Sequence, residues 1–207
     1  MLAPGQIARR ALGRHFQPIG EIYRRVFVHL DRVADFLVDE LPHGATILDI
    51  GGGDGALVNR LLDKRPDLTV TMCDLAPEIG AFLSEENRAK VKHLPATAFY
   101  DVAGSFDAVT ICDVVHHVPA DQREPFFRSL AESCRAWGCR RIILKDMEPR
   151  GWRAWLALFA DRHITGDKHV VPFSRSDFAR LARQYFPGAE RASTVPDWPN
   201  YGEVLSW

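Results

Sequence analysis

The sequence predicts an α/β fold in which a doubly wound, mostly parallel β-sheet carries helices on both faces. Short apolar runs alternate with helical stretches from residue 44 to the end of the chain. One apolar run stops abruptly in the glycine-rich turn of residues 47–55, and polar or charged residues follow several of the other runs. Because ligands bind where the strands of such sheets end, we expect the functional site at that edge.

The strands and helices follow from hydrophobic periodicity and from the residues that break it. We predict strands at 47–50, 69–74, 91–94, 106–118 (including its exit), 141–146, 191–195 and 201–207. We predict helices at 56–64, from near 121 or 124 to 137, at 151–164, and after a capping box formed by Ser174 and Asp177.

Residues 6–41 read as two further helices that are broken near residues 18–20. We therefore predict a helical N-terminal extension over residues 1–43, followed by the main domain over residues 44–207. Apolar surface on these N-terminal helices would allow a homodimer, although nothing in the sequence requires one.

The composition excludes several classes of protein. The 207 residues suffice for one domain, and 46% are hydrophobic and 26% charged. The net charge of -1 gives no general attraction to nucleic acid or to acidic membranes. No apolar run approaches the roughly 20 residues of a membrane helix, and the N-terminus lacks the apolar core of a signal peptide. The four cysteines show no metal-binding spacing, so we expect a cytoplasmic protein with reduced thiols.

The turn at residues 47–55 (ILDIGGGDG) carries the strongest functional signal. Gly51 and Gly53 permit positive φ angles and let the backbone approach a ligand closely. The helix predicted at 56–64 would direct unpaired N–H groups and a partial positive charge at the same place. We therefore expect the turn to bind an anionic or polar group.

Two cofactors compete for this turn. Gly51, Gly53 and Ala56 form a tolerable dinucleotide fingerprint with Asp74 about 20 residues further on, which favours a nicotinamide cofactor. Asp49 favours the other reading, because a carboxylate inside the strand repels a pyrophosphate but suits an ammonium or sulfonium group. S-adenosylmethionine (SAM) has both groups, and its carboxylate would suit the helix N-terminus.

At these residues the sequence resembles the class I SAM-dependent methyltransferases, whose first motif reads much like LDIGGGDG. Residues 106–117 resemble the next motif of that family, a strand beginning Phe-Asp that is followed by a His-His pair. The resemblance covers roughly residues 44–207 and implies a Rossmann-like sheet of seven strands with the last one antiparallel. It also implies that residues 1–43 cover the active site; the alternative, that they pack on the sheet, stays open.

The residues after the second and third predicted strands are the candidates for binding the nucleoside of SAM. Asp74 would hold the ribose diol or cap a following helix, and the two roles are compatible. Leu75 would lie against the adenine. Related methyltransferases often carry an aspartate in the loop at residues 95–99, but this chain has none there, so Thr97 and Ala98 become the candidate contacts.

The ends of the fourth and fifth predicted strands carry polar residues. We expect Cys112 and Asp113 to contact the cofactor. Lys145 and Asp146 would either anchor polar groups of the substrate or form a salt bridge. No further Asp-Asn pair follows to complete an oxygen-rich site, so we expect no metal.

Methyl transfer from a sulfonium needs a general base where the nucleophile carries a proton, and histidine suits that task. The candidates are His117, His116 and His163. The second histidine of the pair could instead bond to the backbone and fix its loop, and His163 could lie at a solvated helix end.

We predict a SAM-dependent O-methyltransferase that acts on a small, secondary-metabolite-like molecule. The Trp and Phe residues between 152 and 173 favour an apolar acceptor, although they could equally form core. Nucleic acid is disfavoured because no Asn/Asp-Pro-Pro-Tyr/Phe motif and no basic aromatic patch occur. The alternatives are an NAD(P)-dependent oxidoreductase and a methyltransferase-like protein that binds SAM without catalysis.

Overall fold

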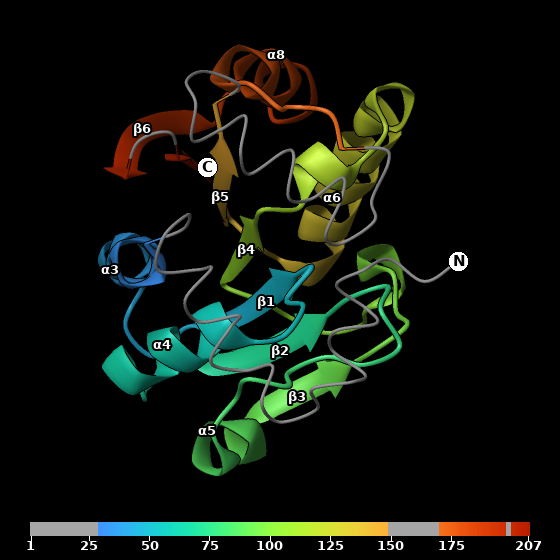
Figure 1. The fold of residues 1–207 in the computed structure, drawn as a ribbon. Helices are drawn as coiled ribbons and strands as arrows, with labels where there is room; N and C mark the ends of the chain where they lie inside the picture. Colours follow the sequence, from blue (N-terminus) through green and yellow to red (C-terminus); the bar gives the residue numbers. More distant parts are fainter. Residues whose placement is uncertain (1–28, 149–169, 198–199) are drawn as a thin grey trace.

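A computed structural model of the chain describes residues 29–148, 170–197 and 200–207. Its strands are β1 (Thr46–Ile50), β2 (Thr69–Cys73), β3 (Val91–Leu94), β4 (Ala108–Cys112), β5 (Arg141–Met147), β6 (Glu190–Asp197) and β7 (Asn200–Ser206). Its α-helices are α3 (Leu30–Glu40), α4 (Ala56–Lys64), α5 (Glu85–Lys90), α6 (Arg123–Trp137) and α8 (Arg175–Tyr185). Figure 1 shows these elements along the chain.

The strands form one seven-stranded sheet in the order β3-β2-β1-β4-β5-β7-β6. β1 to β5 pair in parallel, whereas β7 runs antiparallel to both β5 and β6. The predicted α/β architecture with an antiparallel last strand is therefore confirmed. The chain leaves β1 toward β3 and then returns to β4, so β1 and β4 lie side by side where the strand order reverses. Ligands of open α/β sheets bind at such a reversal.

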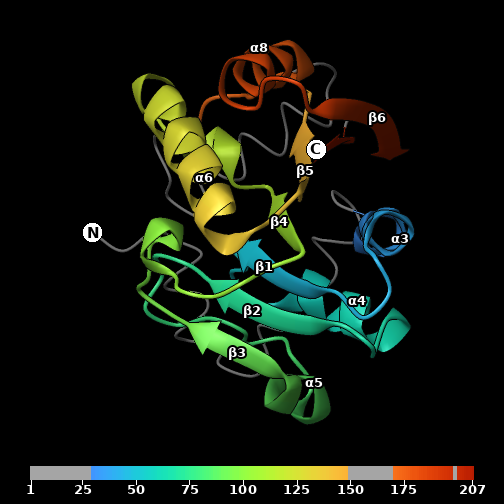
Figure 2. The ribbon, with the colours of Figure 1, turned by 180° about the vertical axis from the view of Figure 1, so that it is seen from behind.

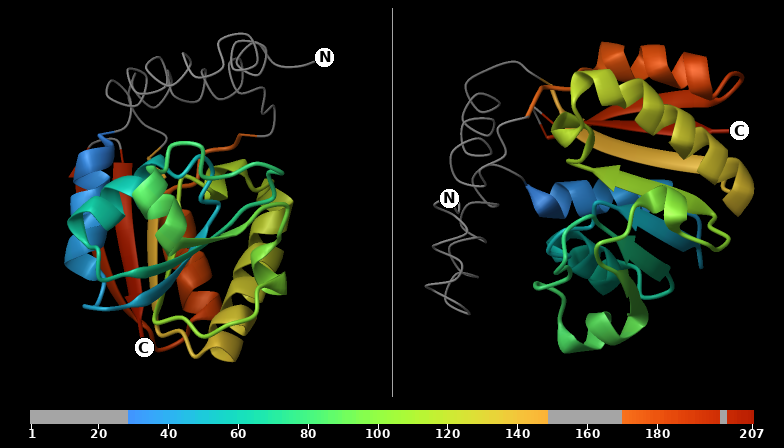
Figure 3. Two further views of the ribbon diagram at one scale, coloured as in Figure 1. Left: turned by 90° about the horizontal axis from the view of Figure 1, so that it is seen from below. Right: turned by 90° about the vertical axis from the view of Figure 1, so that its right-hand side faces the viewer.

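Two helical layers cover the two faces of the sheet (Figures 2 and 3). α6 and α8 pack on one face through buried residues such as Phe127, Leu130 and Phe178. α3 and α4 pack on the other face, where Leu37 and Leu61 belong to a second apolar cluster. Both clusters include strand residues that alternate in direction, as expected for a sheet buried on both sides.

The helix boundaries largely match the sequence prediction because local signals set them. α4 spans the predicted residues, and α6 ends before Gly138, which adopts the left-handed conformation with φ 71°. α8 begins with the predicted capping box, in which the Ser174 hydroxyl accepts from the Asp177 N–H and the Asp177 carboxylate accepts from the Ser174 N–H. In the described ranges, no helix is long and apolar enough to cross a membrane.

α3 is the described part of the predicted N-terminal extension. It packs on the sheet through Val33, Ala34, Phe36 and Leu37, which are buried. The Phe36 ring lies so close to Gly202 that a Cβ atom at residue 202 would come within 2.5 Å of it. This described part of the N-terminal extension therefore packs on the sheet, as one of the two alternatives stated above requires.

Three other predictions fall on residues outside the described ranges. They concern the cover formed by the rest of the N-terminal extension, the helix at 151–164, and the position of His163. All three stay predictions.

Candidate functional site

A cleft of about 930 Å³ lies along the carboxyl ends of β1, β2 and β4. The glycine turn, the loops after β2, β3 and β4, and the first turns of α6 form its walls. The predicted site residues that line it are Gly51, Gly53, Asp74, Leu75, Thr97, Ala98, Asp113 and His117. The sheet thus brings together residues from four separate segments of the chain.

The glycine turn forms the floor of the cleft. Gly51 and Gly53 have φ angles of 73° and 52°, which L-residues with side chains rarely adopt. A Cβ atom on Gly51 would come within 2.4 Å of a methyl carbon of Val114. The Gly51 N–H donates to the carbonyl of Cys73 at 2.8 Å. Glycine is therefore required at residue 51 by both its φ angle and its packing.

Asp74 lies at the end of β2 with both carboxylate oxygens held by backbone N–H groups. Oδ2 accepts from Gly53 at 2.9 Å, and Oδ1 accepts from Ala76 at 2.8 Å. Each oxygen retains a further lone pair toward which a hydroxyl could donate. The carboxylate is thus fixed at the wall of the cleft, in part by the glycine turn itself.

The interpretation of Asp74 as a helix cap is wrong, because residues 75–78 form bends rather than a helix. The Gly80 N–H donates to the carbonyl of Gly53 at 2.9 Å, and the Phe82 N–H donates to that of Asp54 at 2.8 Å. The backbone at residues 80 and 82 therefore pairs with the glycine turn.

Asp49 lies beneath the glycine turn and is 6% exposed. Its Oδ1 accepts from the Thr110 hydroxyl at 2.6 Å. Burial raises the pKa of Asp49 to about 7; the Thr110 hydrogen bond opposes this rise, and the charge of Asp74 adds to it. Asp49 is not among the residues that line the cleft, so its predicted contact with a cationic group of the cofactor stays a prediction.

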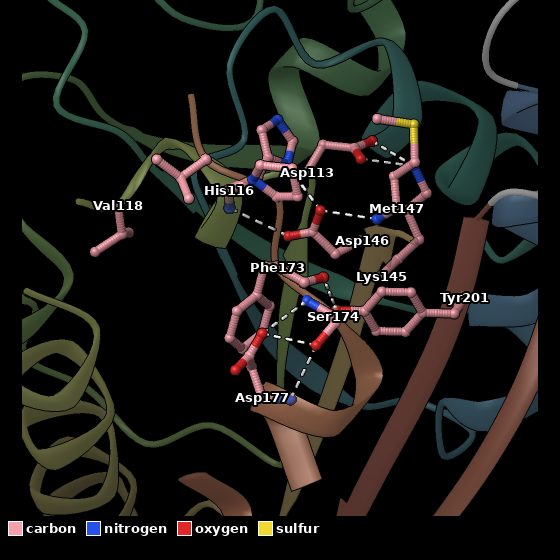
Figure 4. Close-up of polar contacts among 12 residues, drawn as sticks. Asp113, His116, Val118, Lys145, Asp146, Met147, Phe173, Ser174, Asp177 and Tyr201 are labelled. Atoms are coloured by element: carbon pink, nitrogen blue, oxygen red, sulfur yellow. Dashed lines mark hydrogen bonds and ion pairs between the residues drawn. The ribbon is translucent and has the colours of Figure 1, made fainter. Parts of the chain in front are cut away.

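Asp113 and Lys145 form an ion pair at the ends of β4 and β5 (Figure 4). The Lys145 ammonium donates to the two carboxylate oxygens of Asp113 at 2.6 and 2.7 Å, and Lys145 is 1% exposed. Asp113 has a φ of 58°, and its N–H donates to the Lys145 carbonyl at 2.9 Å. Burial would raise the pKa of Asp113, but the charges of Lys145 and His116 outweigh it and lower that pKa. The structure thus gives Lys145 the salt-bridge role.

Cys112 precedes Asp113 but does not line the cleft. It is partly buried, and desolvation raises the pKa of its thiol well above the usual value. Its predicted contact with the cofactor stays a prediction.

The two histidines after β4 lie in a 3-10 turn, Val115–His117, and have different surroundings. The His116 ring is buried, and its Nδ1 lies 2.8 Å from Oδ1 of Asp146. Asp146 is fully buried and also accepts from the N–H groups of His116 and Met147 (Figure 4). His117 lines the cleft, with its ring centroid 4.2 Å from that of His116. The structure thus places His116 and Asp146 behind the cleft and His117 at its wall.

Arg123, at the start of α6, was not predicted as a site residue. Its buried guanidinium donates to the carbonyls of Val118, Val171 and Pro172, and the Val171 N–H donates to the carbonyl of His116. These bonds hold residues 171–172 beside the turn that carries the two histidines. Two of them join residues 48 and 49 positions apart, so no local sequence pattern signals them.

Asp113, His116 and Asp146 each offer a ligand atom for a metal ion, and these atoms lie within 4.8 Å of one another. The Lys145 ammonium already bonds to Asp113, and a second cation beside it would be repelled. The prediction that no metal binds is untested.

Comparison with known proteins gives a consistent picture. Residues 48–139 match the family model described as "Methyltransferase domain". The chain is 31% identical over 129 residues to tRNA N(3)-methylcytidine methyltransferase trm141 of Schizosaccharomyces pombe, which covers 56% of this chain and 50% of that protein. It is 37% identical over 84 residues to Ubiquinone biosynthesis O-methyltransferase of Xanthomonas axonopodis pv. citri, which covers 38% of this chain and 34% of that protein. The chain thus spans half or less of the length of these relatives.

Among solved structures, the fold is similar to that of an O-methyltransferase family 2 protein from Planctomyces limnophilus in complex with apigenin. The TM-score is 0.66 at 16% identity, and the match covers 90% of this chain and 58% of the other. At this identity the likeness concerns the fold alone.

Proposed function

We propose that this chain is a class I SAM-dependent methyltransferase and that it transfers the methyl group of SAM to an oxygen atom of a small-molecule acceptor. The match of residues 48–139 to a methyltransferase domain supports this. The observation that carries the proposal is the cleft floor, where a turn without side chains meets a carboxylate fixed by that turn. Such a floor admits the polar end of a ligand at the backbone and a diol at Asp74.

Each chemical group of SAM would have a candidate partner among the described residues. The glycine turn and the N-terminus of α4 would hold the carboxylate, and Asp74 would hold the ribose diol. Leu75, Thr97 and Ala98 would contact the adenine. The Asp113 carboxylate lines the cleft, and Asp49, when it is ionised, would add negative charge beneath the turn; both would suit an ammonium or sulfonium group. Bound SAM would supply an activated methyl group, and the protein would align the acceptor with it and exclude water.

We propose His117 as the general base, because it lines the cleft. Its imidazole would take the acceptor hydroxyl proton as the new O–CH₃ bond forms and the S–CH₃ bond breaks. His116, held by Asp146, would fix the turn that carries His117. His163 is the remaining candidate and lies outside the described ranges.

The acceptor is proposed to be a small molecule with an apolar body. Apolar and aromatic side chains, among them Tyr100, Val114 and Val118, also line the cleft. The O-methyltransferase relative, and the apigenin named for the structure of similar fold, support this choice. We also propose that the protein works in the cytoplasm and that a homodimer is compatible with its function.

The match to a tRNA methyltransferase favours a second candidate function, methylation of RNA. The net charge of -1 weighs against it, because RNA binding depends strongly on positive charge. The same assay can decide between the two.

Methyl transfer from SAM with a labelled methyl group tests the proposal. We would offer catechol, 4-hydroxybenzoate, apigenin and unmodified tRNA to the wild type, to His117→Ala and to His43→Ala. His43 is a matched control, because its side chain is 91% exposed and it precedes β1, at the opposite edge of the sheet.

The proposal predicts label in a phenol. It also predicts a rate that falls roughly 100-fold or more in His117→Ala and is unchanged in His43→Ala. Label in tRNA alone would favour the second candidate. Equal rates for both histidine variants would refute the role of His117.

A further inference from the structure

The loop after β3 offers few polar side chains to an adenine ring. An adenine edge presents a 6-amino donor beside ring nitrogens that accept hydrogen bonds. Among residues 95–99, Thr97 alone has a polar side chain. Its hydroxyl donates to the carbonyl of Pro95 at 2.9 Å, which fixes it within its own loop. The loop can therefore supply one side-chain acceptor at most and no side-chain donor.

The wall of the cleft at the start of α6 supplies polar side chains that the loop after β3 lacks. Gln122, Pro125, Phe126 and Ser129 all line the cleft, with the spacing of one helix face. The Phe126 ring packs edge-on against that of Phe99, with centroids 5.1 Å apart. This wall is thus apolar except for one carboxamide and one hydroxyl.

The carboxamide of Gln122 has the chemistry that the adenine edge requires. A primary amide carries an acceptor and a donor side by side, and glutamine pairs with adenine in this bidentate way in nucleic-acid recognition. The hydroxyl of Ser129 provides a single group. The backbone of Gln122 is anchored, because its N–H donates to the Pro119 carbonyl at 2.8 Å. Its side-chain amide lies 3.4 Å from Asp121, a long and weak contact that leaves it able to turn into the cleft.

We infer that Gln122 recognises the adenine of SAM, its side-chain oxygen accepting from the 6-amino group and its NH₂ donating to the ring nitrogen N7. The inference rests on the proposed function, since it takes SAM as the ligand. Asp74 and Gln122 line the same cleft, so ribose and adenine would be held by groups that follow β2 and precede α6, respectively.

Calorimetric binding of two nucleosides tests this inference without any acceptor. S-adenosylhomocysteine carries the 6-amino group, and S-inosylhomocysteine carries a carbonyl there instead. We would titrate both into the wild type, Gln122→Met and Ser129→Ala. Gln122 is exposed, so its replacement by methionine should leave the unliganded unfolding temperature unchanged.

The wild type should prefer the adenine nucleoside roughly 10-fold or more, because the 6-oxo purine presents two acceptors, O6 and N7, and the carboxamide can pair with only one of them in a bidentate geometry. Gln122→Met should bind S-adenosylhomocysteine roughly 10-fold more weakly and lose the preference for it, whereas Ser129→Ala should keep the affinity and the preference of the wild type. A preference that survives in Gln122→Met, or is lost in Ser129→Ala instead, would overturn the inference. Binding of neither nucleoside to the wild type would refute SAM binding itself, and the inference with it.

Discussion

Replacing Asp49 with asparagine should change how the stability of the protein depends on pH. The asparagine side chain would keep an oxygen to accept from Thr110, but the change would remove an ionisable group that is 6% exposed. Burial raises the pKa of Asp49 from 3.8 to about 7. This difference in pKa corresponds to about 4 kcal/mol, at about 1.36 kcal/mol per pKa unit.

The sign of the effect follows from proton binding. Because the pKa is raised in the folded state, the folded protein binds the proton more tightly than the unfolded chain does. The stabilising contribution is fully present below about pH 4 and is lost progressively as the pH rises to about 7. The asparagine variant lacks this loss. The free energy of unfolding of the variant, relative to that of the wild type, should therefore increase by roughly 3 kcal/mol between about pH 5 and about pH 8.

Urea unfolding at about pH 5, 6, 7 and 8 measures this difference. Asp39→Asn is the matched control, because it makes the same chemical change at a residue that is exposed on α3. Parallel curves for the wild type and Asp49→Asn across this range would refute the reasoning. They would mean that Asp49 is hydrated and ionised in the folded protein.

Two further predictions follow from contacts around the cleft. Gly51→Ala should lower the free energy of unfolding by roughly 1–3 kcal/mol, because its Cβ would clash with Val114 at 2.4 Å. Gly44→Ala, which has a similar φ of 69° and open space, should cost less, and equal losses in urea unfolding would rule out the clash. Lys145→Met should raise the pKa of the Asp113 carboxyl by removing the ammonium that lowers it. NMR titration measures that pKa, and an equal pKa of Asp113 in the wild type and in Lys145→Met would contradict the prediction.

Much of the fold could be predicted because local signals determine it. The abrupt end of β1 in glycines, the start of α4 and the end of α6 at Gly138 each depend on a few neighbouring residues. The residues at strand ends, such as Asp74 and Asp113, could also be placed, because parallel strands end at one edge of the sheet.

The orientation of side chains in the site could not be predicted in the same way. Asp146 on β5 determines which of the two histidines is held behind the cleft, and this contact joins residues 30 positions apart. The alternative of a helix cap at Asp74 failed because residues 75–78 form bends, and the N–H groups of residues 80 and 82 bond to the glycine turn, which lies more than 20 residues back in the sequence. Such contacts depend on how distant elements pack, and a single sequence carries no local signal for them.

Calorimetric titration of SAM, S-adenosylhomocysteine and NADH into the wild type and Asp74→Ala tests the central claim most directly. We predict binding of the first two, weakened in Asp74→Ala by roughly 1–3 kcal/mol, since the ribose hydroxyls lose their acceptor. Binding of NADH without binding of SAM would contradict the account and would favour the interpretation of the glycine turn as a dinucleotide-binding site.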